Sequence, residues 1–133
     1  MELQVGVKIL LKNKDGKYLV LFRSLGSAPK SGQHWDIAGG RINAGSSLIE
    51  NLKREVIEEA GLEIIGEPKL ITAQDIFKPD KHVVRLTYAG FADGEVKLSE
   101  EHSDYKWASL EEVKNLEPMD KYFKEVLAKF DLS

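Results

Sequence analysis

A run of charged residues near the middle of the chain constrains its fold more than any other part of the sequence. Residues 54–62 read Arg-Glu-Val-Ile-Glu-Glu-Ala-Gly-Leu. On a helix, Glu55, Glu58 and Glu59 occupy positions i, i+3 and i+4, so three carboxylates share one face within about one turn. Such close like charges repel each other, so we expect a cation there, and oxygen ligands favour Mg²⁺ or Mn²⁺. The alternative is an acidic face that only meets water, as most charge runs do.

The flanking residues favour a metal site over a solvated face. Ser47 and Glu50 fit a capping box and Gly61 fits a C-terminal cap, which predicts a helix from about Ser47 to Ala60. Its apolar residues lie within about 120° of one another on the helical wheel, and two of the three glutamates border that stripe. Carboxylates at the edge of a core are costly unless they are paired or bind a metal ion.

A pair of glycines precedes this helix. Gly39 and Gly40 follow the short apolar segment over residues 35–37, and we expect a loop there. Glycine tolerates positive φ and has no side chain, so a loop of this kind lets the backbone approach a ligand closely. The sequence therefore makes Gly39 and Gly40 candidate substrate-binding residues.

The segment resembles the motif of the Nudix hydrolase family, written G-x5-E-x7-R-E-U-x-E-E-x-G-U, where U is a bulky apolar residue. The positions that match at the required spacing are Gly40, Arg54, Glu55, Val56, Glu58, Glu59, Gly61 and Leu62. One position departs, because Ser46 stands where the family has its first glutamate. In the family that glutamate helps to hold the arginine, so we expect Ser46 to affect the orientation of Arg54 more than metal binding. Glu50, one turn before Arg54, could take over part of this pairing.

The resemblance implies the metal ligands. Glu55, Glu58 and Glu59 would hold Mg²⁺ or Mn²⁺, and the backbone carbonyl of Gly40 would add a further ligand. The expected cofactor is therefore a divalent cation held by oxygen atoms.

The resemblance also implies catalytic roles. Glu55 or Glu58 would act as the general base, and Arg54 would orient a carboxylate. Because family members often draw a further acidic residue from a later loop, Glu101 is our first choice for that role, against a solvated turn as the alternative. Arg23, at the end of a predicted strand, could bind a phosphate, although an arginine there is more often a surface charge.

The expected reaction is hydrolysis of the diphosphate bond in a nucleoside diphosphate linked to another moiety. The leading substrates are nucleoside triphosphates, oxidised ones included, and nucleotide sugars such as ADP-ribose. A second class stays open, because Ser46 could mark a non-hydrolysing nucleotide sensor or regulator with the same fold. The retained arginine and glutamates argue against that class, since a binding module has no need for the full carboxylate set.

Composition agrees with a small enzyme. The 133 residues suit a single domain over 1–133. A net charge of −3 argues against nucleic-acid and membrane binding, which both need a basic surface. The chain has no cysteine, and we see neither a signal peptide nor a long apolar segment, so we expect a cytoplasmic protein.

The pattern along the chain predicts mixed α and β structure. Strands are expected over residues 5–12, 18–23, 63–65, 69–77, 82–92, 95–98 and 105–108, a loop over 24–33, and further helices from Ser109 and over 119–130. This order predicts an α/β fold with a mixed sheet covered by helices. The layered arrangement, an α/β/α sandwich, is what the Nudix resemblance implies.

Overall fold

The computed structural model describes residues 1–23 and 32–132, so most of the loop predicted over 24–33 lies outside the described residues. The strands are β1 (Glu2–Lys12), β2 (Tyr18–Arg23), β3 (His34–Asp36), β4 (Ala38–Arg41), β5 (Ile65–Phe77), β6 (Lys81–Phe91) and β7 (His102–Ala108). The helices are α1 (Leu48–Ala60), α2 (Leu110–Asn115) and α3 (Lys121–Lys129). None of these helices has the length and apolar composition needed to cross a membrane.

Strand β1 lies at the centre of a mixed sheet. It runs parallel to β6 and antiparallel to β2 and β4. The main path is β3-β2-β1-β6-β5, while β4 pairs with β1 and β7 pairs with β2, which makes seven strands within the described ranges. The mixed sheet predicted from the sequence is confirmed.

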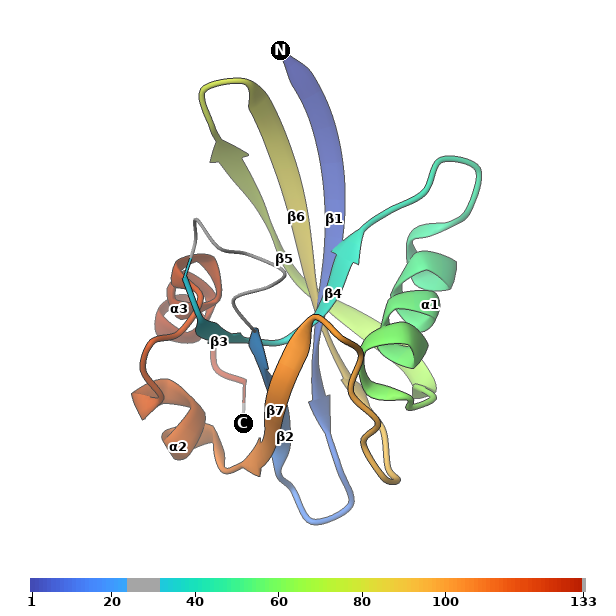
Figure 1. Ribbon diagram of the computed structural model, residues 1–133, viewed down its shortest axis with the longest axis vertical. Coiled ribbons are helices and arrows are strands. Elements are labelled where there is room, and N and C mark those ends of the chain that lie inside the picture. Colours follow the sequence, from blue (N-terminus) through green and yellow to red (C-terminus); the bar gives the residue numbers. More distant parts are fainter. Residues whose placement is uncertain (24–31, 133) are drawn as a thin grey trace.

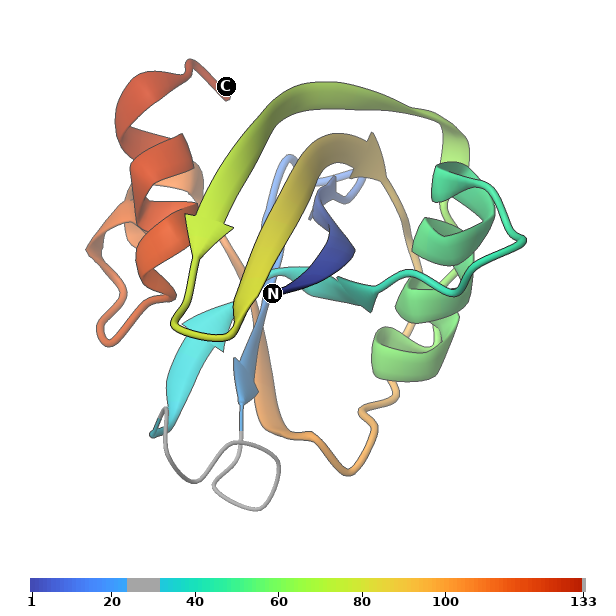
Figure 2. The same cartoon turned by 90° about the horizontal axis from the view of Figure 1, so that it is seen from above.

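Helices cover both faces of this sheet. Figures 1 and 2 show α1 on one side of the sheet and α2 and α3 on the other. Side chains of β1 alternate accordingly, since Val7 and Ile9 pack with Leu52 of α1, whereas Leu10 packs with Phe123 of α3. Burial on both faces explains the apolar runs in β1 and β2, and the α/β/α sandwich is confirmed.

Helix α1 begins and ends where its sequence predicts. The Ser47 hydroxyl accepts from the Glu50 N–H at 3.0 Å, and the Glu50 carboxylate accepts from the Ser47 N–H at 3.1 Å. Gly61 ends the helix with φ 67°, and its N–H donates to the Ile57 carbonyl at 3.0 Å. These caps fix which residues of α1 face the sheet.

The strand predicted over residues 95–98 is wrong. These residues form no regular secondary structure. The Lys97 N–H instead donates to the Ala60 carbonyl at 2.8 Å, and Val96 is buried in the core under α1. This segment therefore packs against the end of α1. Its backbone N–H donates to a carbonyl of the helix instead of to a neighbouring strand.

Two other predictions change in detail. Of the strands predicted over 63–65 and 69–77, residue 65 and residues 69–77 belong to the single strand β5, whose register with β6 shifts at irregularities, and residues 63 and 64 lie before it. The loop predicted at Gly39 and Gly40 is the strand β4. Gly39 has φ 145°, and a Cβ atom there would overlap the backbone of Val7, so glycine permits the close pairing of β4 with β1.

Candidate active site

The carboxylates of α1 differ in their exposure to solvent. Glu55 and Glu59 are buried, with 9% and 6% of their surface exposed, whereas 57% of the Glu58 side chain is exposed. One helical turn separates the two buried residues, which lie beside apolar positions such as Val56 that face the sheet. Helix α1 thus directs the carboxylates of Glu55 and Glu59 toward the sheet and leaves that of Glu58 exposed to solvent.

The glycines of β4 meet these two carboxylates. The Gly39 N–H donates to Glu59 Oε1 at 2.9 Å. A Cβ atom at Gly40 would overlap the carboxylate of Glu55, so the missing side chain makes the space that this carboxylate fills. The structure therefore brings together four residues that the sequence singled out.

The segment that leads into β7 runs beside α1 (Figure 1). It brings Glu101 and His102 to the glutamates of the helix. A ring nitrogen of His102 and one carboxylate oxygen from each of Glu59 and Glu101 lie within 4.8 Å of one another. We call Glu55, Glu58, Glu59, Glu101 and His102 the α1–β7 cluster.

Burial controls the electrostatics of the α1–β7 cluster. Burial raises the pKa of Glu59 to about 7, although Lys8 and the Gly39 N–H act in the opposite direction. Burial also raises the pKa of Glu55 against the effect of Arg54, and the charges of Glu58 and Glu101 add to the increase. These carboxylates hold their negative charge at a cost that a bound cation would relieve.

His102 is buried in the same place. Only 6% of its surface is exposed, and its Nδ1 atom has no hydrogen-bond partner among the described residues. Burial, with Lys8 and Arg23 nearby, lowers the pKa of His102 to about 4. The imidazole is therefore neutral near neutral pH.

Arg54 is held by a residue that the sequence did not single out. Its Nη2 atom donates to Asn51 Oδ1 at 2.8 Å, while its Nη1 atom lies 3.8 Å from Glu55 and 3.7 Å from Glu58. Asn51 is buried and also accepts from the Asn43 N–H at 2.7 Å. It therefore joins Arg54 to the loop that precedes the helix.

The expected pairing of Glu50 with Arg54 does not occur among the described residues. The Glu50 carboxylate is instead bound to the N-cap, where the hydrogen bond from the Ser47 backbone lowers its pKa. Ser46, at the position of the missing glutamate, offers its carbonyl to Asn51 Nδ2 at 3.2 Å. An amide one turn from the arginine thus takes the role we expected of a carboxylate.

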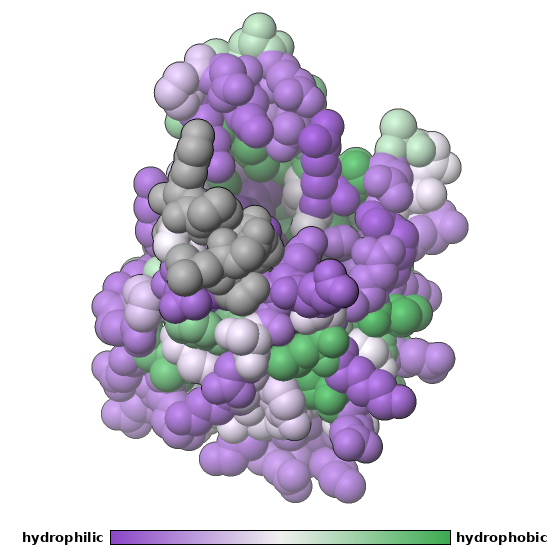
Figure 3. All heavy atoms as spheres, in the orientation of Figure 1, coloured by the Kyte–Doolittle hydropathy of each residue, from purple (hydrophilic) through white to green (hydrophobic). Residues whose placement is uncertain are grey.

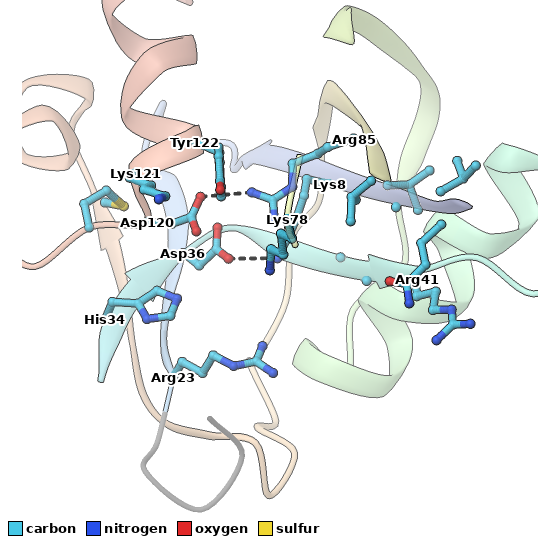
Figure 4. A pocket seen from close by; sticks show the side chains of 18 of the residues that line it. Lys8, Arg23, His34, Asp36, Arg41, Lys78, Arg85, Asp120, Lys121 and Tyr122 are labelled. Carbon is cyan, nitrogen blue, oxygen red and sulfur yellow. Dashed lines mark hydrogen bonds and ion pairs between the residues drawn. The ribbon is translucent and has the colours of Figure 1, made fainter. Parts of the chain in front are cut away.

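A cleft of about 970 Å³ opens next to the glycines of β4. It lies between β1, β4 and β6 and the start of α3, and hydrophilic residues surround the hollow on this face in Figure 3. Gly39 and Gly40 line the cleft and also adjoin the α1–β7 cluster. Arg23, at the end of β2, lines it too (Figure 4).

Two ion pairs lie at this cleft, one buried and one part-buried, and we call them the cleft pairs. Lys8 Nζ lies 2.8 Å from Asp36 Oδ2, and Arg85 Nη1 lies 3.0 Å from Asp120 Oδ2 (Figure 4). Burial would raise the pKa of Asp36, but Lys8 and Arg85 hold it below its ordinary value. Asp120 also caps α3 by accepting from the Phe123 N–H at 2.9 Å.

The sequence contained signals for some of these missed residues. Lys8 interrupts the apolar run of β1, and a charged residue at a buried strand position needs a partner. Asn51 lies inside a helix, where asparagine is unfavourable unless its side chain is bound. The partner of Lys8, Asp36, lies 28 residues away in the sequence, so no local pattern identifies it.

Comparisons with known proteins identify the family of this chain. A family model described as the NUDIX domain matches residues 2–130. Nucleoside triphosphatase NudI of Escherichia coli O17:K52:H18 (strain UMN026 / ExPEC) is 30% identical over 115 residues, which cover 78% of this chain and 80% of the relative.

Solved structures share the fold. The crystal structure of a MutT protein from Methanosarcina mazei Go1 aligns with a TM-score of 0.86 and 32% identity, covering 98% of this chain and 94% of that one. A MutT NUDIX hydrolase from Burkholderia pseudomallei aligns with a TM-score of 0.83 over 98% of this chain and 100% of that one. At 20% identity, the second comparison supports the fold alone.

Proposed function

This chain belongs to the NUDIX family and is a pyrophosphohydrolase of the Nudix type, and we propose that it hydrolyses a nucleoside triphosphate with a divalent metal ion. One observation carries the proposal. Gly39 and Gly40 line the cleft on one side and adjoin the buried carboxylates of Glu55 and Glu59 on the other. A nucleotide bound in the cleft would extend its phosphates past this pair of glycines to the α1–β7 cluster.

The residues present fit a divalent cation. Glu55 and Glu59 are buried carboxylates with raised pKa values, and the absence of a side chain at Gly40 gives the Glu55 carboxylate its place beside the backbone of β4. We propose that Glu55, Glu58 and Glu59 hold Mg²⁺ or Mn²⁺, with the Gly40 carbonyl as a further ligand. When bound, the cation neutralises phosphate charge and makes water more acidic.

The remaining roles belong to side chains of this chain. Arg54, held by Asn51, keeps the carboxylates of Glu55 and Glu58 in place. A carboxylate takes the proton of the attacking water, and the bond between phosphorus and the bridging oxygen breaks to release a nucleotide and a phosphate-bearing fragment. Glu55 suits this role better than the more exposed Glu58, because burial raises its pKa, and Glu101 lies close enough to share it.

The order of candidate substrates follows from the relatives and the cleft. A relative that matches most of the chain is named a nucleoside triphosphatase, so triphosphates come first and nucleotide sugars such as ADP-ribose second. Basic groups at the cleft suit the charge of either class, and we propose Arg23 as a phosphate-binding residue.

A screen of the purified protein against nucleoside triphosphates and nucleotide sugars tests the proposal. We expect release of phosphate or pyrophosphate with Mg²⁺ or Mn²⁺ and no release in EDTA. Glu58→Gln should lose turnover, whereas the matched variant Glu63→Gln, at an exposed position beyond α1, should keep it.

The same experiment tests the second candidate function, a nucleotide sensor, which the serine at position 46 leaves open. A protein that binds a nucleotide by calorimetry, yet hydrolyses no compound of the panel with either ion, would be a sensor. Undiminished hydrolysis in EDTA would contradict both candidate functions, since one requires a metal ion for hydrolysis and the other excludes hydrolysis.

A further inference from the structure

His102 is a buried residue for which the proposed reaction has not yet given a role. It is the first residue of β7, and only 6% of its surface is exposed. Its Nδ1 atom is inaccessible to solvent and has no hydrogen-bond partner within the described part of the chain. Such an atom is costly to bury, because it loses its hydrogen bond to water without gaining another.

The side chains around His102 indicate what kind of partner its ring nitrogen would bind. One carboxylate oxygen from each of Glu59 and Glu101 lies within 4.8 Å of a ring nitrogen and of the other oxygen. Ligands at ~2.1 Å from one ion lie ~3 to 4 Å apart, so small side-chain movements would bring all three atoms to a common cation. Both side chains grouped with the imidazole are carboxylates, and Lys8 and Arg23 also lie near it.

A second group with similar spacing supplies the contrast. His34, Asp36 and Asp120 also offer ligand atoms within 4.8 Å of one another. The two aspartates already hold Lys8 and Arg85, at 2.8 and 3.0 Å. The cation that this second group needs is thus provided by the protein itself.

We propose that His102 supplies a nitrogen ligand to a divalent metal ion held together with Glu59 and Glu101, and that this ligand makes the site prefer Mn²⁺ over Mg²⁺. The inference rests on the proposed function, because it assigns a further ligand to the same site. Mg²⁺ takes oxygen ligands in a strict octahedral arrangement, whereas imidazole nitrogen suits first-row transition ions. A site built only of carboxylates would show a weaker bias toward Mn²⁺.

Electron paramagnetic resonance of bound Mn²⁺ tests the ligand without measuring activity. A nitrogen atom bound directly to Mn²⁺ gives a ¹⁴N hyperfine coupling. The chain has three histidines, at positions 34, 82 and 102. We expect the coupling in the wild-type protein and in the His34→Gln, His82→Gln double variant, where His102 is the remaining histidine.

Titration calorimetry supplies the second measurement. His102→Gln should lose the coupling and at least ~10-fold of its Mn²⁺ affinity, with a smaller change for Mg²⁺. If this variant does not fold, the double variant still decides the question, because its coupling must survive. Absence of the coupling from the wild type or from the double variant would overturn the inference, as would equal loss of affinity for both ions.

The two proposals fail in different ways. A protein that hydrolyses nucleotides but shows no ¹⁴N coupling would contradict the role of His102 and leave the proposed function intact. A protein that shows the coupling but hydrolyses nothing would contradict the proposed function and leave the nitrogen ligand intact.

Discussion

Two groups of carboxylates lie close together in this molecule and differ in how their charge is balanced. In the cleft pairs, each aspartate is bound by a basic side chain, and the pKa of Asp36 lies below its ordinary value. In the α1–β7 cluster, the pKa values of Glu55 and Glu59 lie above theirs. In the cleft pairs, side chains of the protein itself balance the negative charges. In the α1–β7 cluster, the raised pKa values favour a cation from outside the protein.

The largest effect is expected at Glu59. In Glu59→Gln the side-chain oxygen can still accept from the Gly39 N–H, but the charge is lost. Turnover should fall by at least ~10²-fold, because the proposed metal ligand loses its charge. The melting temperature above pH 7 should stay or rise, since an ionised carboxylate is no longer buried.

Steady-state kinetics and thermal melts of the same preparations check this prediction. Glu63→Gln, exposed just beyond α1, is the matched control and should change neither quantity. A loss of stability without a loss of turnover in Glu59→Gln would place Glu59 in the same category as the cleft pairs.

Removal of a carboxylate from the cleft pairs should lower stability, in contrast to Glu59→Gln. Asp36→Asn leaves Lys8 buried without an anionic partner and should lower the free energy of unfolding by about 2 kcal/mol. Glu2→Gln removes a carboxylate from an exposed pair with Arg41 and should have little effect. Denaturant titrations of both variants measure the difference, and equal destabilisation would remove the distinction between buried and exposed pairs.

A further effect is expected in the pH dependence of stability. The folded pKa of Glu59, about 7, exceeds its ordinary value of 4.5, so the folded state holds this proton more tightly than the unfolded state. The contribution to stability is fully present below pH 4.5 and is lost as the pH rises through 7. Asp36, whose pKa is lowered from 3.8, contributes stability above that pH and loses it as the pH falls.

Denaturant titrations of the metal-free protein across this range measure the slope. His102, whose pKa is lowered from 6.5 to about 4, contributes the opposite slope, so the effect of Glu59 is measured as the difference between the wild type and Glu59→Gln. We expect the stability of the wild type relative to this variant to decrease from pH 4.5 to 7 in EDTA, and the decrease to weaken with Mn²⁺, which favours the ionised carboxylate. Equal pH dependence of the two proteins would assign the slope to another group.

The smallest effect is expected at Ser46. Because Asn51 already holds Arg54 at 2.8 Å, the glutamate of Ser46→Glu should add only one partly exposed ion pair. Such a pair supplies roughly 0.2 to 1 kcal/mol, or at most a few-fold in turnover. Asn51→Ser should cost more than Ser46→Glu gains, and kcat/KM of the two variants makes the comparison. A large gain in Ser46→Glu would mean that Arg54 is poorly oriented in the wild type.

Local patterns predicted the parts of the fold that depend on neighbouring residues. Helix α1 is one of them, since Ser47, Glu50 and Gly61 fix its ends by contacts within a few residues. The strand predicted over 95–98 failed, because its backbone bonds to the end of a helix that lies far away in the sequence. The layered arrangement came from the family resemblance, as periodicity alone indicated only mixed α and β content.

The same limit applies to the site. The spacing of the glutamates indicated the carboxylates of α1, and the motif placed Gly40 beside them. The partner of Arg54 was missed, because Glu50 at i−4 was a plausible choice until its carboxylate was found on the N-cap. His102 carried no local signal, since a histidine after two glutamates reads as part of a solvated turn until the fold buries it.

Proton release on metal binding tests the central claim most directly, namely that the α1–β7 cluster takes a cation from outside. Mn²⁺ would be titrated into the metal-free protein at about pH 6.5, in two buffers with different ionisation enthalpies. We predict that binding releases roughly one proton in the wild type and much less in Glu59→Gln, because the ion displaces the proton held by Glu59. Absence of Mn²⁺ binding, or the same proton release in both proteins, would contradict the account.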